Sequence, residues 1–244
     1  MRTHNLKCWL KTLCAASRTQ QGNVLIPLIL SSDQSSNSAT NGEGLIQFQQ
    51  SKIMRHRVFL AIDLPQSVTT AIQNIQAGMV QQAPSIVRWT KTDLLHITLK
   101  FAGAVQDSDM QPIQRELEHS ASLFQTFSLE YKDMGVFPNK RNPRVLWLGI
   151  TPSASLTQLA QISESVFASH DYEPEKRPFQ AHLTIGRFKD RFTQPELQNF
   201  LTNLAIIKEQ IHYNQKVDHI TLYESTLTPK GPVYTVLSRM PFKS

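Results

Sequence analysis

Cysteine, long apolar runs and glycine-rich motifs are all scarce in this sequence of 244 residues. Its two cysteines, Cys8 and Cys14, cannot by themselves build a disulfide framework or a cysteine-based zinc site, and their scarcity suits a reducing compartment. The apolar stretch VLIPLIL, residues 24–30, is interrupted by Pro27 and is far too short to span a bilayer. No glycine-rich phosphate loop joins a strand to a helix, and no G-x-S-x-G elbow marks a serine hydrolase.

Strong positive charge is missing from most of the chain. Of the net charge of +6, the first 53 residues contribute +3, from five basic residues against two acidic ones. Residues 54–244 carry 20 basic and 17 acidic residues and supply the other +3. A domain this mildly basic is not a strong nonspecific binder of duplex nucleic acid, because that task needs many phosphate contacts. A local basic site for a short anionic ligand remains open.

Residues 1–53 differ in composition from the rest of the chain. The stretch SSDQSSNSATNGEG, residues 31–44, has no large apolar side chains and predicts a disordered linker. We expect 1–53 to be a disordered or non-native extension that can be deleted without loss of fold or activity, and 54–244 to be the functional domain. We expect a cytoplasmic monomer with no membrane partner, and the basic start of the chain leaves a targeting segment as the weaker alternative.

Strand and helix patterns alternate from residue 57 onwards. Runs of β-type residues predict strands at 57–64, 87–89, 94–101, 127–134, 144–150, 181–188, 218–226 and 232–240, the last two forming a hairpin around TPKG. Apolar residues at helical spacing predict helices that begin at Pro65 and Asp107 and helices over 154–169 and 195–204. Asp107 or Ser108 is the expected cap of the second helix. This order favours an α+β protein of two similar lobes, one in each half of the chain, over a doubly wound parallel sheet.

Two of the predicted strands contain the same short pattern, HITL at 96–99 and HLTI at 182–185. Because side chains alternate between the faces of a strand, one face of the first strand carries His96, Thr98 and Lys100. Its other face carries the apolar residues Leu95, Ile97, Leu99 and Phe101. The second strand likewise places His182, Thr184 and Gly186 together. If the strands are neighbours across a pseudo-twofold axis, two imidazoles and two hydroxyls face a common groove.

This set of side chains suits the cleavage of a phosphodiester. One histidine, with a pKa near ~6.5, can activate water as a base while the other protonates the leaving oxygen as an acid. Two hydroxyls can donate hydrogen bonds to the nonbridging phosphate oxygens, where charge develops. No metal or other cofactor is required. Two structural histidines are the alternative, whereas a zinc site is disfavoured because neither strand supplies a third ligand on the same face.

Five blocks of the sequence, taken in order, resemble the 2H phosphoesterase superfamily. The resemblance is specifically to the RNA 2′,3′-cyclic phosphodiesterases of the LigT type, historically called 2′-5′ RNA ligases, and it spans about residues 54–243. The blocks are RVFLAIDLP, VRWTKTDLLHITLKFAGAV, GVFPNKRNPRVLWLGI, RPFQAHLTIGRF and LYESTLTPKGPVYTVL. The resemblance implies two pseudo-symmetric lobes whose antiparallel sheets line a central groove, with the helices outside.

The resemblance also implies a reaction and a role for each motif residue. The reaction is the opening of an RNA-terminal 2′,3′-cyclic phosphate to a 2′-phosphomonoester, and its reversal joins tRNA halves by a 2′-5′ linkage. His96 would be the proton donor and His182 the proton acceptor, a distinction that strand parity does not make, and Thr98 and Thr184 would bind the phosphate. A phosphodiesterase acting on small cyclic-phosphate nucleotides and a non-catalytic RNA- or nucleotide-binding module remain alternatives.

Five more residues are candidates for contact with RNA, namely Arg187, Lys140, Arg141, Arg144 and Phe137. Simple alternation places Arg187 opposite His182, but a bulge at Gly186 would turn it toward the groove, and the alternative is an ordinary surface arginine. For Lys140, Arg141 and Arg144, in and beside the loop at 137–143, contact with an RNA backbone is one interpretation and a solvated turn is the other. For Phe137, the two interpretations are stacking on a base and packing in the core. We expect five other histidines to be structural or surface residues: His56, His119, His170, His212 and His219.

Overall fold

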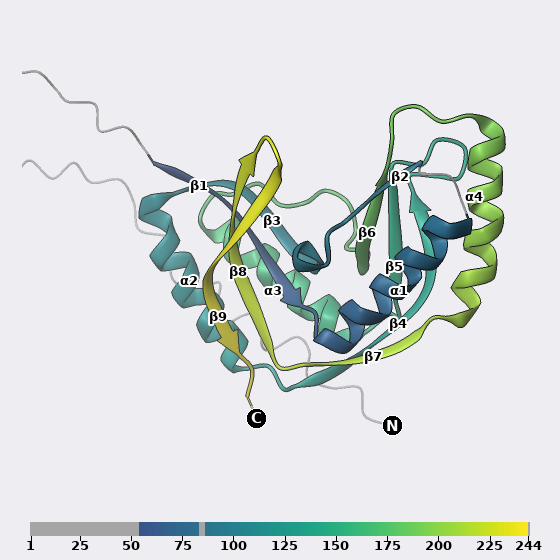
Figure 1. The fold of residues 1–244 in the computed structure, drawn as a ribbon. Helices are drawn as coiled ribbons and strands as arrows, with labels where there is room; N and C mark the ends of the chain where they lie inside the picture. The colour runs from purple at the N-terminus through teal and green to yellow at the C-terminus, as the bar shows by residue number, and fades with distance from the viewer. Residues whose placement is uncertain (1–53, 83–85, 244) are drawn as a thin grey trace, which may run out of the picture. The chain divides into compact units, whose positions relative to one another are not determined.

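The computed structural model describes residues 54–82 and 86–243, which form two antiparallel sheets and four α-helices (Figure 1). The expectations for residues 1–53 lie outside this part of the chain. The strands are β1 (Arg55–Asp63), β2 (Val87–Trp89), β3 (His96–Gln106), β4 (Phe127–Phe137), β5 (Val145–Ile150), β6 (His182–Phe188), β7 (His212–Val217), β8 (His219–Thr228) and β9 (Gly231–Pro241). The helices are α1 (Gln66–Gln82), α2 (Asp107–Ser122), α3 (Ala154–Ser169) and α4 (Gln194–Ile207), and short 3-10 turns cover Thr92–Leu94 and Lys208–Gln210.

The two sheets confirm the α+β class but divide the chain differently from the expected halves. The first sheet has the order β3-β1-β8-β9 and the second the order β2-β6-β5-β4-β7. The C-terminal hairpin returns to pair with β1, and β2 leaves the N-terminal half to pair with β6. Each sheet therefore contains strands from both halves of the chain.

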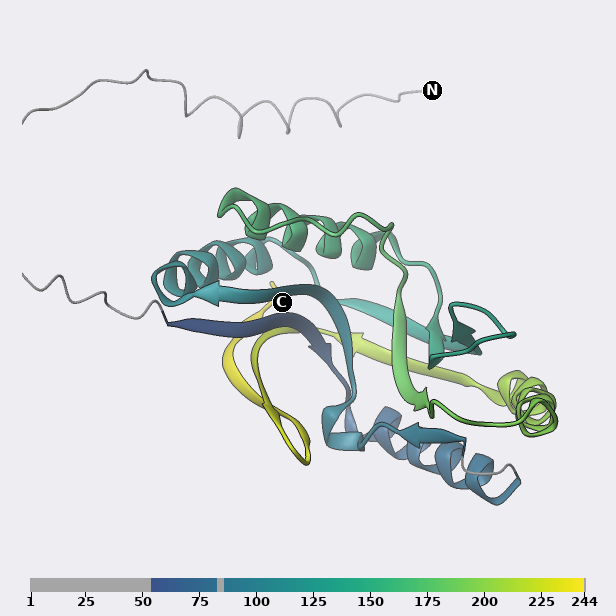
Figure 2. The same ribbon diagram turned by 90° about the horizontal axis from the view of Figure 1, so that it is seen from above.

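Helices cover one face of each sheet. In the first sheet α2 and α3 contact β3, and α2 also packs on β8 and β9; Figure 2 shows α2 and α3 side by side on one side of β1 and β3. On the second sheet α1 contacts β7 and α4, and Phe200 of α4 packs edge-on against Phe188 of β6 at 5.3 Å between ring centroids. The opposite face of each sheet is thereby left to hold the motif side chains.

The helices predicted from apolar spacing are confirmed. The inward residues predicted for α1 and α3 are buried or packed on the core, including Val68, Ile72, Met79, Leu156 and Leu159. The predicted cap of α2 is wrong. Strand β3 runs directly into α2, so Gln106 is the N-cap, and it makes no side-chain capping bond. Its backbone N–H instead donates to the hydroxyl of Tyr172 at 2.9 Å.

Strand β7 was not predicted. Its residues HYNQKV are mostly polar, and it is an edge strand paired only with β4. Its one buried polar side chain, Gln215, donates through Nε2 to the carbonyl of Asp63 at 2.6 Å and accepts from the Tyr131 hydroxyl. This contact ties the second sheet to the end of β1. None of the helices within 54–82 and 86–243 is long and apolar enough to cross a membrane.

Candidate active site

The two motif strands lie in different sheets and contact one another. Each strand carries a β-bulge three residues after its histidine. In β3, Thr98 and Lys100 pair with the consecutive residues Ala61 and Leu60, so Leu99 is the extra residue. In β6, Thr184 and Gly186 pair with the consecutive residues Trp147 and Leu146, so Ile185 is the extra residue. A bulge reverses the alternation of the side chains that follow it.

Because of the bulge in β3, the faces predicted for Lys100 and Phe101 are wrong. His96, Thr98 and Phe101 are paired with Asp63, Ala61 and Phe59, which alternate along β1 and so share one face. We call this the motif face of the first sheet. Lys100 lies on the helix-covered face, where it is 3% exposed and its Nζ lies 2.6 Å from Glu164 of α3. Phe101, expected in the core, is 48% exposed.

Both motif histidines are held by the same hydrogen bond. The Nδ1–H of His96 donates to the Leu94 carbonyl at 2.9 Å, and the Nδ1–H of His182 donates to the Gln180 carbonyl at 2.8 Å. In each case the acceptor lies two residues earlier in the chain. This bond assigns the proton to Nδ1 and leaves Nε2 of each ring able to accept or give a proton. Thr98 is exposed and Thr184 is half-buried, each on the face of its own histidine.

A cluster of three aromatic rings, of which Phe59 is buried and Tyr223 and Tyr234 are half-buried, lies against His96. Phe59 packs 4.7 Å from its ring and also contacts Tyr223 and Tyr234, and Tyr234 meets His96 edge-on at 5.4 Å. Burial lowers the pKa of His96, although its bond to the Leu94 carbonyl and the negative charge of Asp63 act in the opposite direction. The neutral imidazole is therefore favoured in the unliganded protein.

Asp63 is the acceptor of a hydrogen-bond network beside His96. Its carboxylate accepts from the Tyr223 hydroxyl at 2.6 Å and the Thr221 hydroxyl at 2.8 Å, and His219 Nε2 lies 3.2 Å away. Burial alone would raise the pKa of Asp63, but hydrogen bonds from His219, Tyr223 and Thr221 outweigh it and lower this pKa to about 2. Asp63 is therefore a fixed negative charge on the motif face.

The sequence contains a signal for this network that the expectations for His219 overlooked. Residues 219–222 read HITL, the same letters as 96–99. The third H-x-T strand, β8, pairs with β1 and directs His219 and Thr221 to Asp63. His219 is not free for proton transfer, because its Nδ1 also lies 2.6 Å from Asp218, and its contacts with Asp63 and Asp218 raise its pKa.

An aromatic ring also lies against His182 in the second sheet. Phe137 of β4 meets the His182 ring edge-on at 5.2 Å and lies 5.2 Å from Trp147 of β5. Phe137 is half-buried, and its contact with His182 places it at the candidate site. Each motif histidine is thus packed against a phenylalanine of its own sheet, Phe59 for His96 and Phe137 for His182.

Arg187 lies on the motif face of the second sheet because of the bulge. It pairs with Val145, while Thr184 pairs with Trp147, so both side chains share a face. A Cβ at Gly186 would lie 2.5 Å from Val87 Cγ1, so glycine allows β2 to approach here. Burial raises the pKa of the Tyr234 hydroxyl, and the positive charges of Arg187 and Arg57 act in the opposite direction and lower it. Arg187 is exposed.

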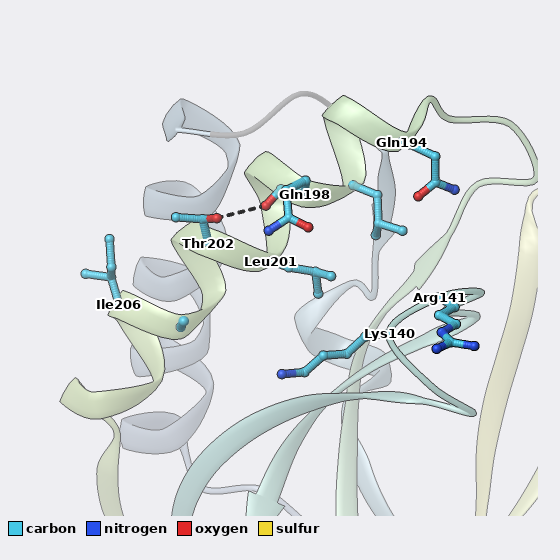
Figure 3. Close-up of a pocket in the computed structure, with 9 residues that line it drawn as sticks. Lys140, Arg141, Gln194, Gln198, Leu201, Thr202 and Ile206 are labelled. Carbon is cyan, nitrogen blue, oxygen red and sulfur yellow. Dashed lines mark hydrogen bonds between the residues drawn. The ribbon is translucent and has the colours of Figure 1, made fainter.

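The basic residues between β4 and β5 lie in another place. Lys140 and Arg141 line an open pocket against α4 together with Gln194, Gln198, Leu201 and Thr202 (Figure 3). None of the motif residues lines this pocket. Arg144 is exposed, and its guanidinium lies 3.4 Å from Asp190. These three residues are therefore not gathered around the histidines.

Comparisons with known proteins agree with this fold. A family model of the 2′-5′ RNA ligase superfamily matches residues 64–230. RNA 2′,3′-cyclic phosphodiesterases from Methanothermobacter thermautotrophicus and Archaeoglobus fulgidus are 30% and 32% identical to this chain. These matches cover 75% and 73% of this chain and 96% of each relative. The structure of E. coli LigT complexed with 3′-AMP superposes with a TM-score of 0.61 at 27% identity, covering 78% of this chain and 99% of LigT.

A second solved structure, a protein of Thermus thermophilus, superposes with a TM-score of 0.62 at 25% identity and covers 76% of this chain and 97% of its own. The matches confirm the resemblance drawn from the five sequence blocks. The chain belongs to the 2′-5′ RNA ligase superfamily and has the fold of the LigT-like 2H phosphoesterases.

Proposed function

We propose that this protein hydrolyses RNA-terminal 2′,3′-cyclic phosphates to 2′-phosphomonoesters, with His96 as proton donor and His182 as proton acceptor. The observation that carries the proposal is the matched setting of the two rings. Each histidine binds a backbone carbonyl through Nδ1, so each has Nε2 available, and each shares a face with a threonine two residues on. The names of the relatives, RNA 2′,3′-cyclic phosphodiesterase, supply the substrate class.

The proposed reaction is a single displacement at phosphorus. Nε2 of His182 takes a proton from water as the water oxygen bonds to phosphorus. The bond between phosphorus and O3′ breaks, and protonated His96 gives its Nε2 proton to O3′. The products are a 3′-hydroxyl and a 2′-phosphomonoester. The hydroxyls of Thr98 and Thr184 donate to the nonbridging oxygens, where negative charge develops.

The donor role requires His96 to be charged when the substrate is bound. Burial lowers its pKa in the free protein, whereas the negative charge of Asp63 acts to raise it. An anionic phosphate placed beside the ring raises the pKa further, because an opposite charge favours the protonated form. Substrate binding itself therefore favours the protonated form of His96 that the reaction needs.

The same geometry accommodates ligation, in which the P–O3′ bond again breaks but the attacking group is a different hydroxyl. If the 5′-hydroxyl of a second RNA takes the place of water, attack on the cyclic phosphate joins the two ends by a 2′-5′ linkage, and tRNA halves are the candidate substrates. Arg187 and Phe137 lie at the site to contact the terminal nucleotide. Lys140, Arg141 and Arg144 are proposed to meet a more distant part of the RNA. We place the protein in the cytoplasm as a monomer.

The direct test offers the full chain an oligoribonucleotide that ends in a 2′,3′-cyclic phosphate, in buffer containing EDTA. We expect quantitative conversion to the 2′-phosphate, because the two histidines suffice for proton transfer. A 3′-phosphate product, or a rate that disappears in EDTA, would contradict the mechanism. Hydrolysis of mononucleoside cyclic phosphates alone would favour the small-nucleotide alternative, and binding of the oligonucleotide without turnover would favour the binding module.

Single substitutions test the two histidines. His96→Ala and His182→Ala should each lower kcat by about 10²–10⁴, the range for loss of one general acid or base, while the oligonucleotide still binds. His119→Ala is the matched control, because His119 is exposed on α2. The rate of the unmodified protein should follow a bell-shaped pH profile, and a monotonic profile would count against an acid and base pair.

A further inference from the structure

Phe101 is an exposed aromatic ring on the motif face of the first sheet. Among the described residues it is the only aromatic side chain of the large exposed hydrophobics, at 48% exposure. It pairs with Phe59, whose ring packs on His96, so Phe101 is the next position along the same face. The exposed part of the ring would gain free energy if a ligand covered it, because apolar surface is stabilised when it leaves water.

Arg57 lies over this ring. Its guanidinium carbon is 4.7 Å from the Phe101 ring centroid, a cation–π contact that fixes the ring and presents a positive charge beside it. Arg57 forms no ion pair with a carboxylate in the part of the chain that the structure describes. An aromatic face beside an unpaired arginine is the combination that binds single-stranded nucleic acid, because the ring stacks on a base and the guanidinium meets a phosphate.

The apolar surface continues from Phe101 toward the hairpin of β8 and β9. Val236 is 44% exposed and pairs with Tyr223, and Leu227, near the hairpin tip, is 66% exposed. Tyr223 donates to Asp63, so these residues are on the motif face as well. Phe101, Val236 and Leu227 therefore give this part of the motif face an apolar surface, with Arg57 beside it.

The distance from His96 sets which base the site can hold. Phe101 lies opposite Phe59, which is four residues before Asp63, the partner of His96, and this is a backbone separation of roughly 13 Å at about 3.3 Å per residue. The base of the nucleotide that carries the cyclic phosphate lies close to its own ribose and so falls near Tyr234 and Phe59, which contact His96. Phe101 lies further from His96 along the motif face, so we infer that its ring takes the next base.

Resting on the proposed function, we propose that Phe101 and Arg57 form a stacking site for the base of the penultimate nucleotide, so that the enzyme acts on RNA ends of two or more nucleotides in preference to mononucleotides. The stacking is tolerant of base identity, because every base has a π-face. The contact is made with the part of the substrate that does not react, so it raises kcat/KM for oligonucleotides over that for mononucleotides.

The experiment compares three substrates that end in the same 2′,3′-cyclic phosphate: a mononucleotide, a dinucleotide and a dinucleotide that is abasic at its first position. We expect kcat/KM of the unmodified protein for the dinucleotide to exceed the other two values by about 5- to 100-fold, the range for one stacked base. Phe101→Leu should remove this advantage and leave the mononucleotide rate unchanged, which also shows that the variant is folded. Phe101→Tyr should keep the advantage.

Val80→Ala is the control, because Val80 is also exposed, at 55%, and lies on α1 outside the proposed contacts with RNA. It should leave all three rates unchanged. Equal rates on the three substrates, or loss of the dinucleotide advantage in Val80→Ala but not in Phe101→Leu, would overturn the stacking site while the proposed reaction stands. If the unmodified protein opens none of the cyclic phosphates, the proposed reaction fails, and the stacking site fails with it.

Discussion

Asp63 and His96 lie directly opposite each other across the ladder that joins β1 to β3. The carboxylate is ionised at any pH at which an RNA phosphodiesterase works, because hydrogen bonds from His219, Tyr223 and Thr221 outweigh its burial and hold its pKa at about 2. Its charge favours the imidazolium form of His96, against the burial that lowers the pKa of that ring. In the proposed mechanism, where His96 is the proton donor, Asp63 is therefore a positioning residue that favours the protonated form of the ring.

Asp63→Asn should shift the pH dependence of the reaction. Removal of the negative charge lowers the pKa of His96 further, so the protonated donor is lost at a lower pH, and the alkaline limb of the kcat profile moves toward acid by about one unit. The measurement is kcat between pH 5 and 9, together with an NMR titration of the histidine. Asp190→Asn, at a side chain that is 84% exposed, is the control and should leave both limbs in place. An unchanged alkaline limb in Asp63→Asn would show that the carboxylate has no influence on the donor.

Asp63 should also govern stability in acid. Its pKa is lowered from 3.8 to about 2 in the folded protein, so its contribution to the free energy of unfolding is present above about pH 4 and is lost as the pH falls toward 2. A shift of this size corresponds to at most about 2.5 kcal/mol. Urea unfolding at pH 2.5, 4 and 6 should show a steeper loss for the unmodified protein than for Asp63→Asn. Parallel stability curves for the two proteins would contradict the assignment.

Regular periodicity made the helices and motif strands predictable. The apolar positions of α1 and α3 recur at helical spacing and are buried, and the histidine and threonine of each motif share a face, as simple alternation requires. Alternation failed at Lys100 and Phe101, because the bulge at Leu99 exchanges their faces. A bulge depends on the partner strand, so nothing within LHITLKF indicates it.

The network around Asp63 could not be predicted from local pattern for a different reason. Asp63, His96 and His219 come together only through the strand order β3-β1-β8, and His219 lies 156 residues after Asp63. Antiparallel topology decides which strands become neighbours, and spacing along the chain carries no record of it. The repeated HITL at 219–222 was nevertheless a usable signal, and its histidine is the one of the three whose two ring nitrogens both face carboxylates.

The buried pair of Lys100 and Glu164 should respond asymmetrically to substitution. Lys100 is 3% exposed and its Nζ also donates to the Glu173 carbonyl at 3.0 Å, whereas the Glu164 side chain is 27% exposed. Glu164→Gln leaves a buried ammonium without its counter-charge and should lower the free energy of unfolding by about 3–5 kcal/mol. Lys100→Met removes the buried charge and leaves a carboxylate that water can reach, so it should cost less. Urea unfolding of both variants measures the two free energies of unfolding. An equal decrease in both variants would show that the unpaired ammonium is not the cause of the destabilisation.

Deletion of residues 1–53 should leave the phosphodiesterase intact. The family match covers residues 64–230, and the relatives are covered to 96% by about three quarters of this chain. A protein beginning at Met54 should therefore show the same kcat/KM on a cyclic-phosphate oligonucleotide and the same urea midpoint as the full chain. The backbone N–H of Asp107 donates to the Met54 carbonyl at 3.1 Å, so a second truncation that removes Met54 should lower the urea midpoint. A truncated protein that is insoluble or inactive would refute the prediction.

Gly135→Ala should disturb the second histidine through two aromatic rings. A Cβ at Gly135 would lie within 2.8 Å of three ring carbons of Trp147, and Trp147 packs on Phe137, which packs on His182. Because the indole is rigid, the added methyl group displaces it, and overpacking of this kind costs about 1–3 kcal/mol of stability. We expect a lower urea midpoint and a lower kcat, with the loss in kcat following the displacement of Phe137 from His182.

Gly78→Ala is the matched control for that substitution, since Gly78 lies inside α1 and an added Cβ there meets no atom within 4 Å. Alanine is the better helix former by about 1 kcal/mol, so this variant should be at least as stable as the unmodified protein and equally active. The contrast between two identical chemical changes isolates the effect of Trp147. If Gly135→Ala kept both its stability and its kcat, the stack of Trp147 and Phe137 would have no part in holding His182, and the orientation of that ring would depend on the Gln180 carbonyl alone.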